Sequence, residues 1–249
     1  MSRVAIITGA ARGIGRGIAE HLYEKGYDVA LVDVLESVKQ TASEIGPEAR
    51  VTPYIADIRS QEEVKVLMKK VYSKYGQIDS VVNVAGTNHR NSFEDTTLEA
   101  WDLDIATNLT GSFLMCQSAI FPYMKQQNYG RIVNIASVAA KTGGIGPIYE
   151  DGRGGKSGIA YASSKAGLVN MTKWIAKEVG KYGITCNSIA PGYVETDMTR
   201  GNEYDLSQLP VKRNGTPYDI AHATEFLLQK ESSYITGVCL HVDGGSVMS

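Results

Sequence analysis

The sequence has little cysteine and no long hydrophobic run. Its three cysteines, Cys116, Cys186 and Cys239, show no CxxC spacing, so neither a disulfide framework nor a metal site is predicted. No stretch of about 18 apolar residues occurs that could form a membrane-spanning helix. The first apolar run, at residues 4–7, is too short for a signal peptide. We therefore expect a protein of the reducing cytoplasm with no membrane partner.

An excess of charge of one sign is also missing. Lys and Arg number 25 and Asp and Glu number 27, and the basic residues are scattered among acidic ones rather than gathered in blocks. A nucleic-acid partner is therefore not expected. Hydrophobic residues make up 43% and charged residues 21% of the chain. This balance is that of a globular protein with a large core, not of a disordered or fibrous one.

What the chain does have is a regular alternation of short β-rich runs and longer amphipathic stretches. The predicted strands are 4–8, 28–33, 51–55, 80–84, 131–136, 185–190 and 238–242, and the predicted helices include 14–25, 61–75, 106–125, 161–181 and 218–229. Such alternation is typical of βαβ units with right-handed crossovers. We predict one α/β domain over residues 1–249, with a doubly wound, mainly parallel seven-stranded sheet of the Rossmann type and helices on both faces.

A glycine-rich turn follows the first predicted strand. Gly9, Gly13 and Gly15 lie where the strand passes into the first helix, and such a turn brings main-chain N–H groups close to a pyrophosphate at a helix N-terminus. Asp33 ends the second strand, where a carboxylate accepts hydrogen bonds from ribose hydroxyls and repels a 2′-phosphate. Arg12 could instead contact a 2′-phosphate. Giving Asp33 the greater weight, we predict NAD rather than NADP.

Tyr161 and Lys165 stand four positions apart in a predicted helix. This spacing puts a phenol and an ammonium on one helix face. A nearby positive charge favours the phenolate and so lowers the pKa of a phenol, which would make the pair a general acid and base for an alcohol oxygen. The spacing alone also fits a tyrosine packed on the core beside a solvated lysine.

Taken in order, several motifs resemble the short-chain dehydrogenase/reductase family. They are the glycine turn, Asp33, the run 83–86 (Asn-Val-Ala-Gly), Asn108, Ser137, the Tyr161/Lys165 pair, the run 191–196 (Pro-Gly-Tyr-Val-Glu-Thr), the run 234–237 and the run 242–245. The resemblance covers nearly the whole chain. It implies an oxidoreductase that transfers hydride reversibly between a nicotinamide cofactor and a secondary alcohol or ketone.

The resemblance also implies roles for the matching positions. Tyr161 corresponds to the catalytic acid and base, and Lys165 to the group that lowers its pKa and binds the nicotinamide ribose. Ser137 corresponds to the hydroxyl that polarises the substrate C–O group, and Asn108 to the residue that holds a relay water. The implied cofactor contacts are Gly9, Arg12, Gly13, Ile14, Gly15, Asp33, Asp57, Ile58, Asn83, Ala85, Gly86, Tyr161, Lys165, Pro191, Gly192, Val194 and Thr196.

The chain departs from the family pattern at three places. Val84 replaces the second asparagine of the usual Asn-Asn-Ala-Gly. Ser137 and Tyr161 are 24 positions apart, whereas the family spaces them by about a dozen, and the stretch after Thr196 is short. We interpret residues 142–158 as an inserted loop at the mouth of the site, either a lid over the substrate or an oligomer contact. In the first case Tyr149, Glu150, Asp151, Arg153 and Lys156 would contribute to specificity.

The residues near the mouth of the site bear on the substrate class. The inserted loop is polar, and Asn88, His89 and Arg90 follow the strand-four turn, so we expect a small polar alcohol such as a polyol or sugar. Alternatives are a 3-oxoacyl thioester, a hydroxysteroid and a chain that binds NAD as a regulator without catalysis. The acyl-carrier-protein reductases of the family usually prefer NADP, and they carry basic docking residues where this chain has Asn128 and Tyr182.

Two of the predicted helices carry apolar residues on more than one face. These residues include Phe113, Met115, Cys116, Met171 and Trp174. Such faces need a cover besides the sheet. The family commonly pairs these helices between subunits, so the resemblance implies a homotetramer, with a dimer as the alternative.

Overall fold

A computed structural model describes residues 2–144, 157–201, 206–207 and 209–248. They form a parallel sheet of order β3-β2-β1-β4-β5-β6-β7. The strands are β1 (Val4–Thr8), β2 (Asp28–Asp33), β3 (Val51–Ile55), β4 (Ser80–Asn83), β5 (Gly130–Ile135), β6 (Ile184–Pro191) and β7 (Cys239–Val242). The order reverses between β1 and β4, so their carboxyl ends flank the crevice where doubly wound sheets bind ligands. The predicted fold class is confirmed.

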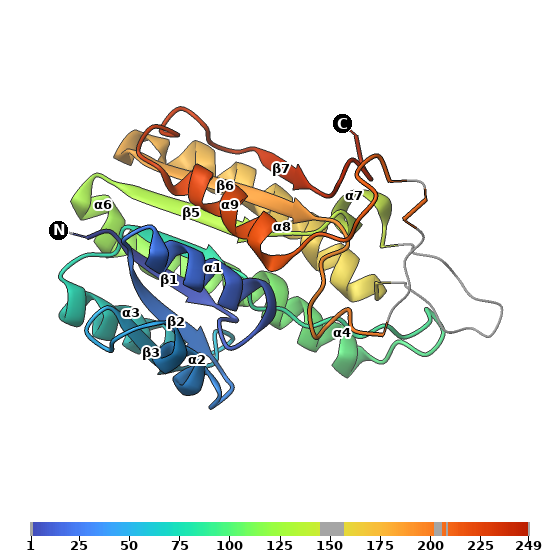
Figure 1. Ribbon diagram of the computed structural model, residues 1–249, viewed down its shortest axis with the longest axis horizontal. Coiled ribbons are helices and arrows are strands. Elements are labelled where there is room, and N and C mark those ends of the chain that lie inside the picture. The colour runs from blue at the N-terminus through green and yellow to red at the C-terminus, as the bar shows by residue number, and fades with distance from the viewer. Residues whose placement is uncertain (1, 145–156, 202–205, 208, 249) are drawn as a thin grey trace.

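Helices cover both faces of the sheet (Figure 1). The described helices are α1 (Gly13–Glu24), α2 (Val38–Ile45), α3 (Gln61–Tyr75), α4 (Leu98–Ile105), α5 (Ser112–Ala119), α6 (Lys125–Gln127), α7 (Ala139–Thr142), α8 (Ile159–Val179) and α9 (Pro217–Leu228). One buried cluster joins the sheet to α1, α2 and α9. The other joins it to α3, α5 and α8. Burial of both sheet faces explains why the central strands β1 and β2 are nearly continuous apolar runs.

The stretch predicted as one helix over 106–125 is interrupted. A π-helical turn (η1, Ala106–Gly111) follows α4, and a second (η2, Ile120–Met124) follows α5. Phe121 has a non-helical backbone with φ −115° and ψ 108°. Pro122 explains this, because the residue before a proline is driven out of the helical region by steric clash.

The apolar residues on these helices divide into two groups. Met115 and Cys116 are buried in the core, so the expectation that they need a cover besides the sheet is wrong for them. Met171 is partly buried and packs against the same core. Phe113 and Trp174 are 42% and 66% exposed.

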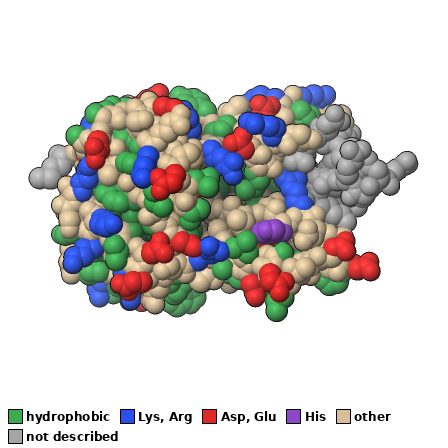
Figure 2. Space-filling model, turned by 90° about the horizontal axis from the view of Figure 1, so that it is seen from below, with side chains coloured by type: hydrophobic (Ala, Val, Ile, Leu, Met, Phe, Trp, Pro, Cys, Tyr) green, Lys and Arg blue, Asp and Glu red, His purple; other side chains and the backbone are tan. Residues whose placement is uncertain are grey.

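Other features of the described residues bear on partners. No helix among them is long and apolar enough to cross a membrane. No group of three or more His, Cys, Asp or Glu side chains in this part of the chain could hold a metal ion. On the face that Figure 2 shows, acidic and basic side chains alternate over the described surface.

Candidate functional site

The glycine-rich turn is shaped by close contacts that leave no room for side chains. Gly9 has φ +65°, and a β-carbon on it would lie 2.8 Å from the Cα of Ala85. A β-carbon on Gly15 would collide with the carbonyl oxygen of Gly9. Helix α1 begins at Gly13, its N-cap Arg12 makes no side-chain capping bond, and its first turn has no acidic residue. These residues therefore fit a pyrophosphate, because the N–H groups of the first turn point outward with a favourable helix dipole.

Asp33 lies beside this turn. One carboxylate oxygen accepts a hydrogen bond from the N–H of Ala11 at 3.0 Å, and the other accepts from the N–H of Leu35 at 3.1 Å. The two bonds fix the carboxylate at the end of β2, next to the turn. This is the position that a ribose-binding acid needs.

The turn after β4 is attached to β1 by a hydroxyl that the sequence analysis missed. Thr8 is fully buried, and its Oγ1 accepts hydrogen bonds from the N–H groups of Val84 at 3.0 Å and Ala85 at 3.1 Å. Asn83 is 2% exposed, and its Nδ2 donates to Asn134 Oδ1 at 2.8 Å. This burial argues against a cofactor contact through the side chain of Asn83, whereas Ala85 and Gly86 in the same turn are only half-buried.

Lys165 and Tyr161 are one helical turn apart near the start of α8. The Lys165 Nζ is 5.5 Å from the centroid of the Tyr161 ring. Lys165 is 3% exposed, and its Nζ donates a hydrogen bond to the carbonyl of Ile135 at 2.7 Å. The alternative of a solvated lysine therefore does not apply here. A buried ammonium beside a phenol can stabilise the phenolate and so promote proton transfer.

Asn108 reaches the same place from the π-helical turn η1. A β-carbon on Gly86 would lie 3.0 Å from Asn108 Oδ1 and 3.6 Å from Lys165 Nζ. The Asn108 amide also accepts from the N–H of Thr87 at 2.8 Å and donates to the Thr87 carbonyl at 2.9 Å and to Ser164 Oγ at 3.0 Å. Asn108 therefore connects the strand-four turn to α8. A π-helical turn often marks a functional position in a helix.

The burial of Lys165 and the charge of a buried carboxylate change the pKa of Lys165 in opposite directions. The pKa of Lys165 lies at about 8, because desolvation lowers it by more than the charge of Asp104 raises it. Asp104 is fully buried and accepts hydrogen bonds from Thr87 Oγ1 at 2.6 Å and from His89 Nδ1 at 2.8 Å. This residue was not predicted from the sequence. Its signal was its place four positions before Asn108 in the same helical stretch.

Ser137 lies two positions after Ile135, whose carbonyl binds Lys165. Its Oγ accepts a hydrogen bond from the N–H of Ala139 at 3.1 Å, at the start of α7, and α7 packs on α8. The ends of the insertion meet, because Ser157 N–H donates to the Gly144 carbonyl at 2.8 Å. The residues proposed to give specificity, Tyr149, Glu150, Asp151, Arg153 and Lys156, lie outside the described part of the chain.

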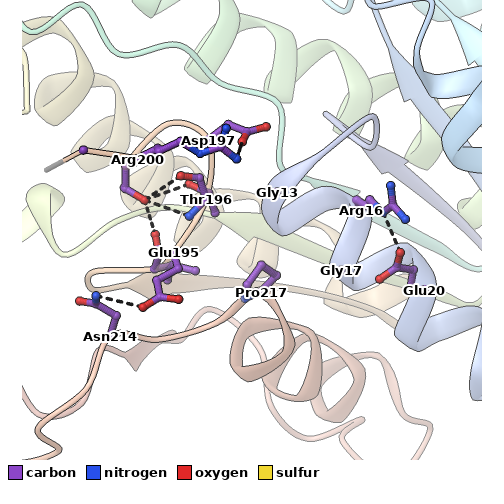
Figure 3. A pocket seen from close by; sticks show the side chains of 13 residues that line it. Gly13, Arg16, Gly17, Glu20, Glu195, Thr196, Asp197, Arg200, Asn214 and Pro217 are labelled. Carbon is purple, nitrogen blue, oxygen red and sulfur yellow. Dashed lines mark hydrogen bonds and ion pairs between the residues drawn. The ribbon is translucent and has the colours of Figure 1, made fainter.

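The run after β6 faces the glycine turn. A β-carbon on Gly13 would lie 3.5 Å from the side chain of Thr196. Val194 is buried and bridges to Gly215. A cavity of about 590 Å³ opens between this run and α1, and Figure 3 shows Gly13, Arg16 and Gly17 on one side of it and Thr196, Asp197 and Arg200 on the other. Gly192 packs closely against Asp243, and Pro191 ends β6.

Arg12 and Asp57, two further predicted cofactor contacts, are paired with oppositely charged side chains. The Arg12 guanidinium is 66% exposed and lies 3.9 Å from a carboxylate oxygen of Asp197. The Asp57 carboxylate binds Arg59, which lowers the pKa of Asp57. Ile58 is 5% exposed and packs on Gly111. Arg12 and Asp57 would have to exchange or share these partners in order to contact a cofactor.

Comparison with known proteins identifies the family. Residues 9–247 match the family described as Enoyl-(Acyl carrier protein) reductase. The chain is 36% identical to the 3-oxoacyl-acyl-carrier-protein reductase FabG of Staphylococcus epidermidis over 100% of both chains. It is 37% identical to the protein of that name from Thermotoga maritima, over 99% of this chain and 98% of the other. This chain belongs to the short-chain dehydrogenase/reductase family.

A solved structure agrees with this assignment. The 3-ketoacyl-(acyl-carrier-protein) reductase from Brucella melitensis, complexed with NADH, has a TM-score of 0.88 and 30% sequence identity, over 99% of this chain and 98% of that one. The chain is thus an oxidoreductase of this family. The prediction of a small polar alcohol as substrate is wrong, because these relatives are named for 3-oxoacyl substrates and fit the alternative of a 3-oxoacyl thioester.

Proposed function

We propose that this protein reduces 3-oxoacyl thioesters to 3-hydroxyacyl thioesters. The observation that carries the proposal is the identity of 36–37% with 3-oxoacyl-acyl-carrier-protein reductases over essentially the whole chain. The buried ammonium of Lys165 beside the Tyr161 ring supplies the acid and base chemistry that such a reduction needs.

In this proposal Tyr161 donates its phenolic proton to the C3 oxygen of the substrate. Ser137 donates a hydrogen bond to that oxygen, whose negative charge grows as the carbonyl is reduced. Lys165 stabilises the phenolate that Tyr161 becomes, and Asn108 holds the chain around Lys165 in place. A reduced nicotinamide supplies the hydride when it is bound. One hydride and one proton then convert the ketone into a secondary alcohol.

We propose NAD(H) as the cofactor. Asp33 is held at the end of β2 by two main-chain N–H groups, so a 2′-phosphate would meet a fixed negative charge. The glycine turn and the N-terminus of α1 would hold the pyrophosphate, and Thr196 would lie over Gly13. The relatives' names leave the cofactor open, although the Brucella enzyme is described with NADH.

The reaction is tested with purified protein, NADH and acetoacetyl-coenzyme A, by following absorbance at 340 nm. We expect turnover with this thioester and a large loss of kcat in Tyr161→Phe, which should keep its affinity for NADH. Ribitol, sorbitol and a hydroxysteroid with NAD serve as comparison substrates. Turnover of one of these without turnover of the thioester would refute the proposal, as would a Tyr161→Phe variant with a near-normal rate.

The choice of cofactor is tested separately. We expect kcat/KM with NADH to exceed that with NADPH by at least about tenfold, since the penalty of an unpaired like charge exceeds about 1.4 kcal/mol. Asp33→Ser should reduce this ratio by raising activity with NADPH. A wild-type protein that prefers NADPH would contradict the role of Asp33 and leave the reaction itself unaffected.

A basic cluster supports an acyl carrier as the source of the thioester. The ammonium groups of Lys125 and Lys181 lie 5.0 Å and 5.3 Å from the centroid of the Tyr182 ring. A β-carbon on Gly183 would lie 2.6 Å from the Asn128 carbonyl oxygen, so Asn128 is close to the same place. Two neighbouring lysines thus supply positive charge where Asn128 and Tyr182 do not.

We also propose that the protein acts as a homotetramer. Phe113 on α5 and Trp174 on α8 are 42% and 66% exposed, and a second copy would cover such apolar surface. Light scattering coupled to size-exclusion chromatography tests this. A Trp174→Glu variant should dissociate, and a wild-type monomer at micromolar concentration would refute the proposal.

A further inference from the structure

A carboxylate without solvent contact lies next to the residues proposed for catalysis. Asp104 is at the end of α4 and has no exposed surface. It accepts hydrogen bonds from Thr87 Oγ1 at 2.6 Å, from the His89 N–H at 3.1 Å and from His89 Nδ1 at 2.8 Å. Burial of a carboxylate is strongly unfavourable unless it is paired and hydrogen-bonded. All three donors come from residues 87–89, so this carboxylate determines the position of that segment.

The segment 87–89 is also fixed by Asn108. The N–H and the carbonyl of Thr87 both bond to the Asn108 amide. The hydroxyl of Thr87 donates a hydrogen bond to Asp104. Every polar group of Thr87 therefore has a partner on the helical stretch that contains Asp104 and Asn108. These two residues are four positions apart and thus neighbours on a helix.

The same segment contacts the start of α8, which carries Tyr161. Asn88 Oδ1 accepts a hydrogen bond from the N–H of Gly158, the N-cap of α8, at 2.9 Å. A β-carbon on Gly158 would collide with the main-chain carbonyl of His89. A shift of residues 87–89 would therefore be transmitted to the first turn of α8.

Among the residues that the structure describes, two titratable groups act on the Lys165 ammonium. Tyr161 lies on its own helix, with the ring centroid 5.5 Å from Nζ, and Asp104 interacts from α4. On β5 its contact is a neutral carbonyl, that of Ile135. The negative charge of Asp104 opposes the desolvation that lowers the pKa of Lys165.

We propose that Asp104 is a positioning residue, whose buried carboxylate fixes residues 87–89 against Asn108 and stabilises the ammonium of Lys165. This rests on the roles proposed above for Lys165 and Asn108. Asp104 therefore acts in two ways, through the geometry of Thr87 and through its charge.

The variant Asp104→Asn removes the charge and keeps the size of the side chain. We expect kcat for acetoacetyl-coenzyme A to fall by about tenfold or more with a smaller change in KM, because small displacements of catalytic groups have effects of this size. The alkaline limit of the pH profile should move about one unit lower, because loss of an opposite charge allows Lys165 to deprotonate earlier. Asp102→Asn is the matched control, since Asp102 lies on the same helix and is exposed.

Thr87→Val separates the two effects. It removes one donor to the carboxylate and keeps the charge, so kcat should fall while the alkaline limit stays in place. If Asp104→Asn does not fold, kcat of Thr87→Val still tests whether Asp104 acts by positioning residues 87–89. A folded Asp104→Asn with the wild-type alkaline limit would overturn the electrostatic role, and a folded Thr87→Val with the wild-type kcat would overturn the positioning role.

A readout without turnover keeps this inference distinct from the proposed function. In protein labelled with [13Cε]lysine, the Lys165 resonance, assigned with Lys165→Arg, should titrate near pH 8 in the wild type and lower in Asp104→Asn. If the wild type reduces no 3-oxoacyl thioester, the proposed function fails, and this titration still decides whether Asp104 acts on Lys165. Equal midpoints in the two proteins would refute that action.

Discussion

Replacement of Thr8 by valine should destabilise the protein and loosen the cofactor crevice. Thr8 is fully buried at the carboxyl end of β1, and its hydroxyl oxygen accepts hydrogen bonds from the N–H groups of Val84 and Ala85. Valine has nearly the same shape as threonine. The change therefore leaves no cavity and deprives two main-chain donors of their acceptor.

The magnitude follows from these two bonds. A buried donor without a partner costs about 1–3 kcal/mol. Val84 and Ala85 are half-buried, so the lower part of this range applies to each, and the free energy of unfolding should fall by about 2–3 kcal/mol. For a chain of this size that loss corresponds to a melting temperature lower by about 4–12 °C. Because a β-carbon on Gly9 would touch Ala85, the affinity for NADH should fall as well.

Urea unfolding followed by circular dichroism measures the change, with NADH affinity taken from fluorescence. Thr224→Val is the matched control, since Thr224 is equally buried and its hydroxyl donates one bond to a carbonyl of α9. That carbonyl is inside a helix, so we expect a loss of no more than about 1 kcal/mol. Equal losses of stability in the two variants would refute the argument that Thr8 holds the strand-four turn.

Three further predictions concern other parts of the molecule. Burial lowers the pKa of His21, so below about pH 6.5 the unfolded chain takes up a proton that the folded chain does not. The free energy of unfolding should therefore fall as the pH is lowered below about 6.5, and it should fall less steeply in His21→Leu. Gly86→Ala would put a methyl group 3.0 Å from Asn108 Oδ1 and should lower kcat by about tenfold. Changing Lys125 and Lys181 together to glutamate should raise KM by about tenfold for an acyl-carrier thioester and leave KM for the coenzyme A thioester unchanged.

Each of these has its own control. Urea midpoints of the wild type and of His21→Leu, measured at several pH values, test the prediction for His21. The same dependence of the midpoint on pH in both proteins would contradict it. For Gly86→Ala the matched variant is Gly180→Ala, because a β-carbon on Gly180 would have none of the described residues within 4 Å apart from its own chain neighbours. Equal rates in the two variants would contradict the contact. A double lysine variant that affects both thioesters alike would argue against docking at this cluster.

The strands and the order of motifs could be predicted from the sequence because both depend on local patterns. The limits of β1, β2 and β3 agree with the predicted ranges to the residue, since each is an apolar run bounded by turn residues. Helix α4 was missed because it is only eight residues long, too short for a helical periodicity to stand out, and because its position depends on packing against α8. The interruption at Phe121 was readable in principle from Pro122.

The partners of the site residues could not be predicted in the same way. The sequence shows Asn108 and Lys165, but not that Thr87 supplies the groups that bind the Asn108 amide. Asp104 looks in the sequence like one more acid of a solvated helix beside Asp102. Asp104 is buried because residues 87–89, about 15 positions earlier in the chain, pack against α4.

The wrong substrate prediction has a physical explanation of the same kind. Asn128 and Tyr182 were judged position by position, and neither is basic. In the folded chain, however, Lys125 and Lys181 surround the Tyr182 ring from two different helical segments. A docking partner responds to the field of a surface rather than to the charge at one alignment position. Under the proposed function Lys125 and Lys181 would supply the positive charge of a docking surface, and the fold shows that both ammonium groups lie beside the Tyr182 ring.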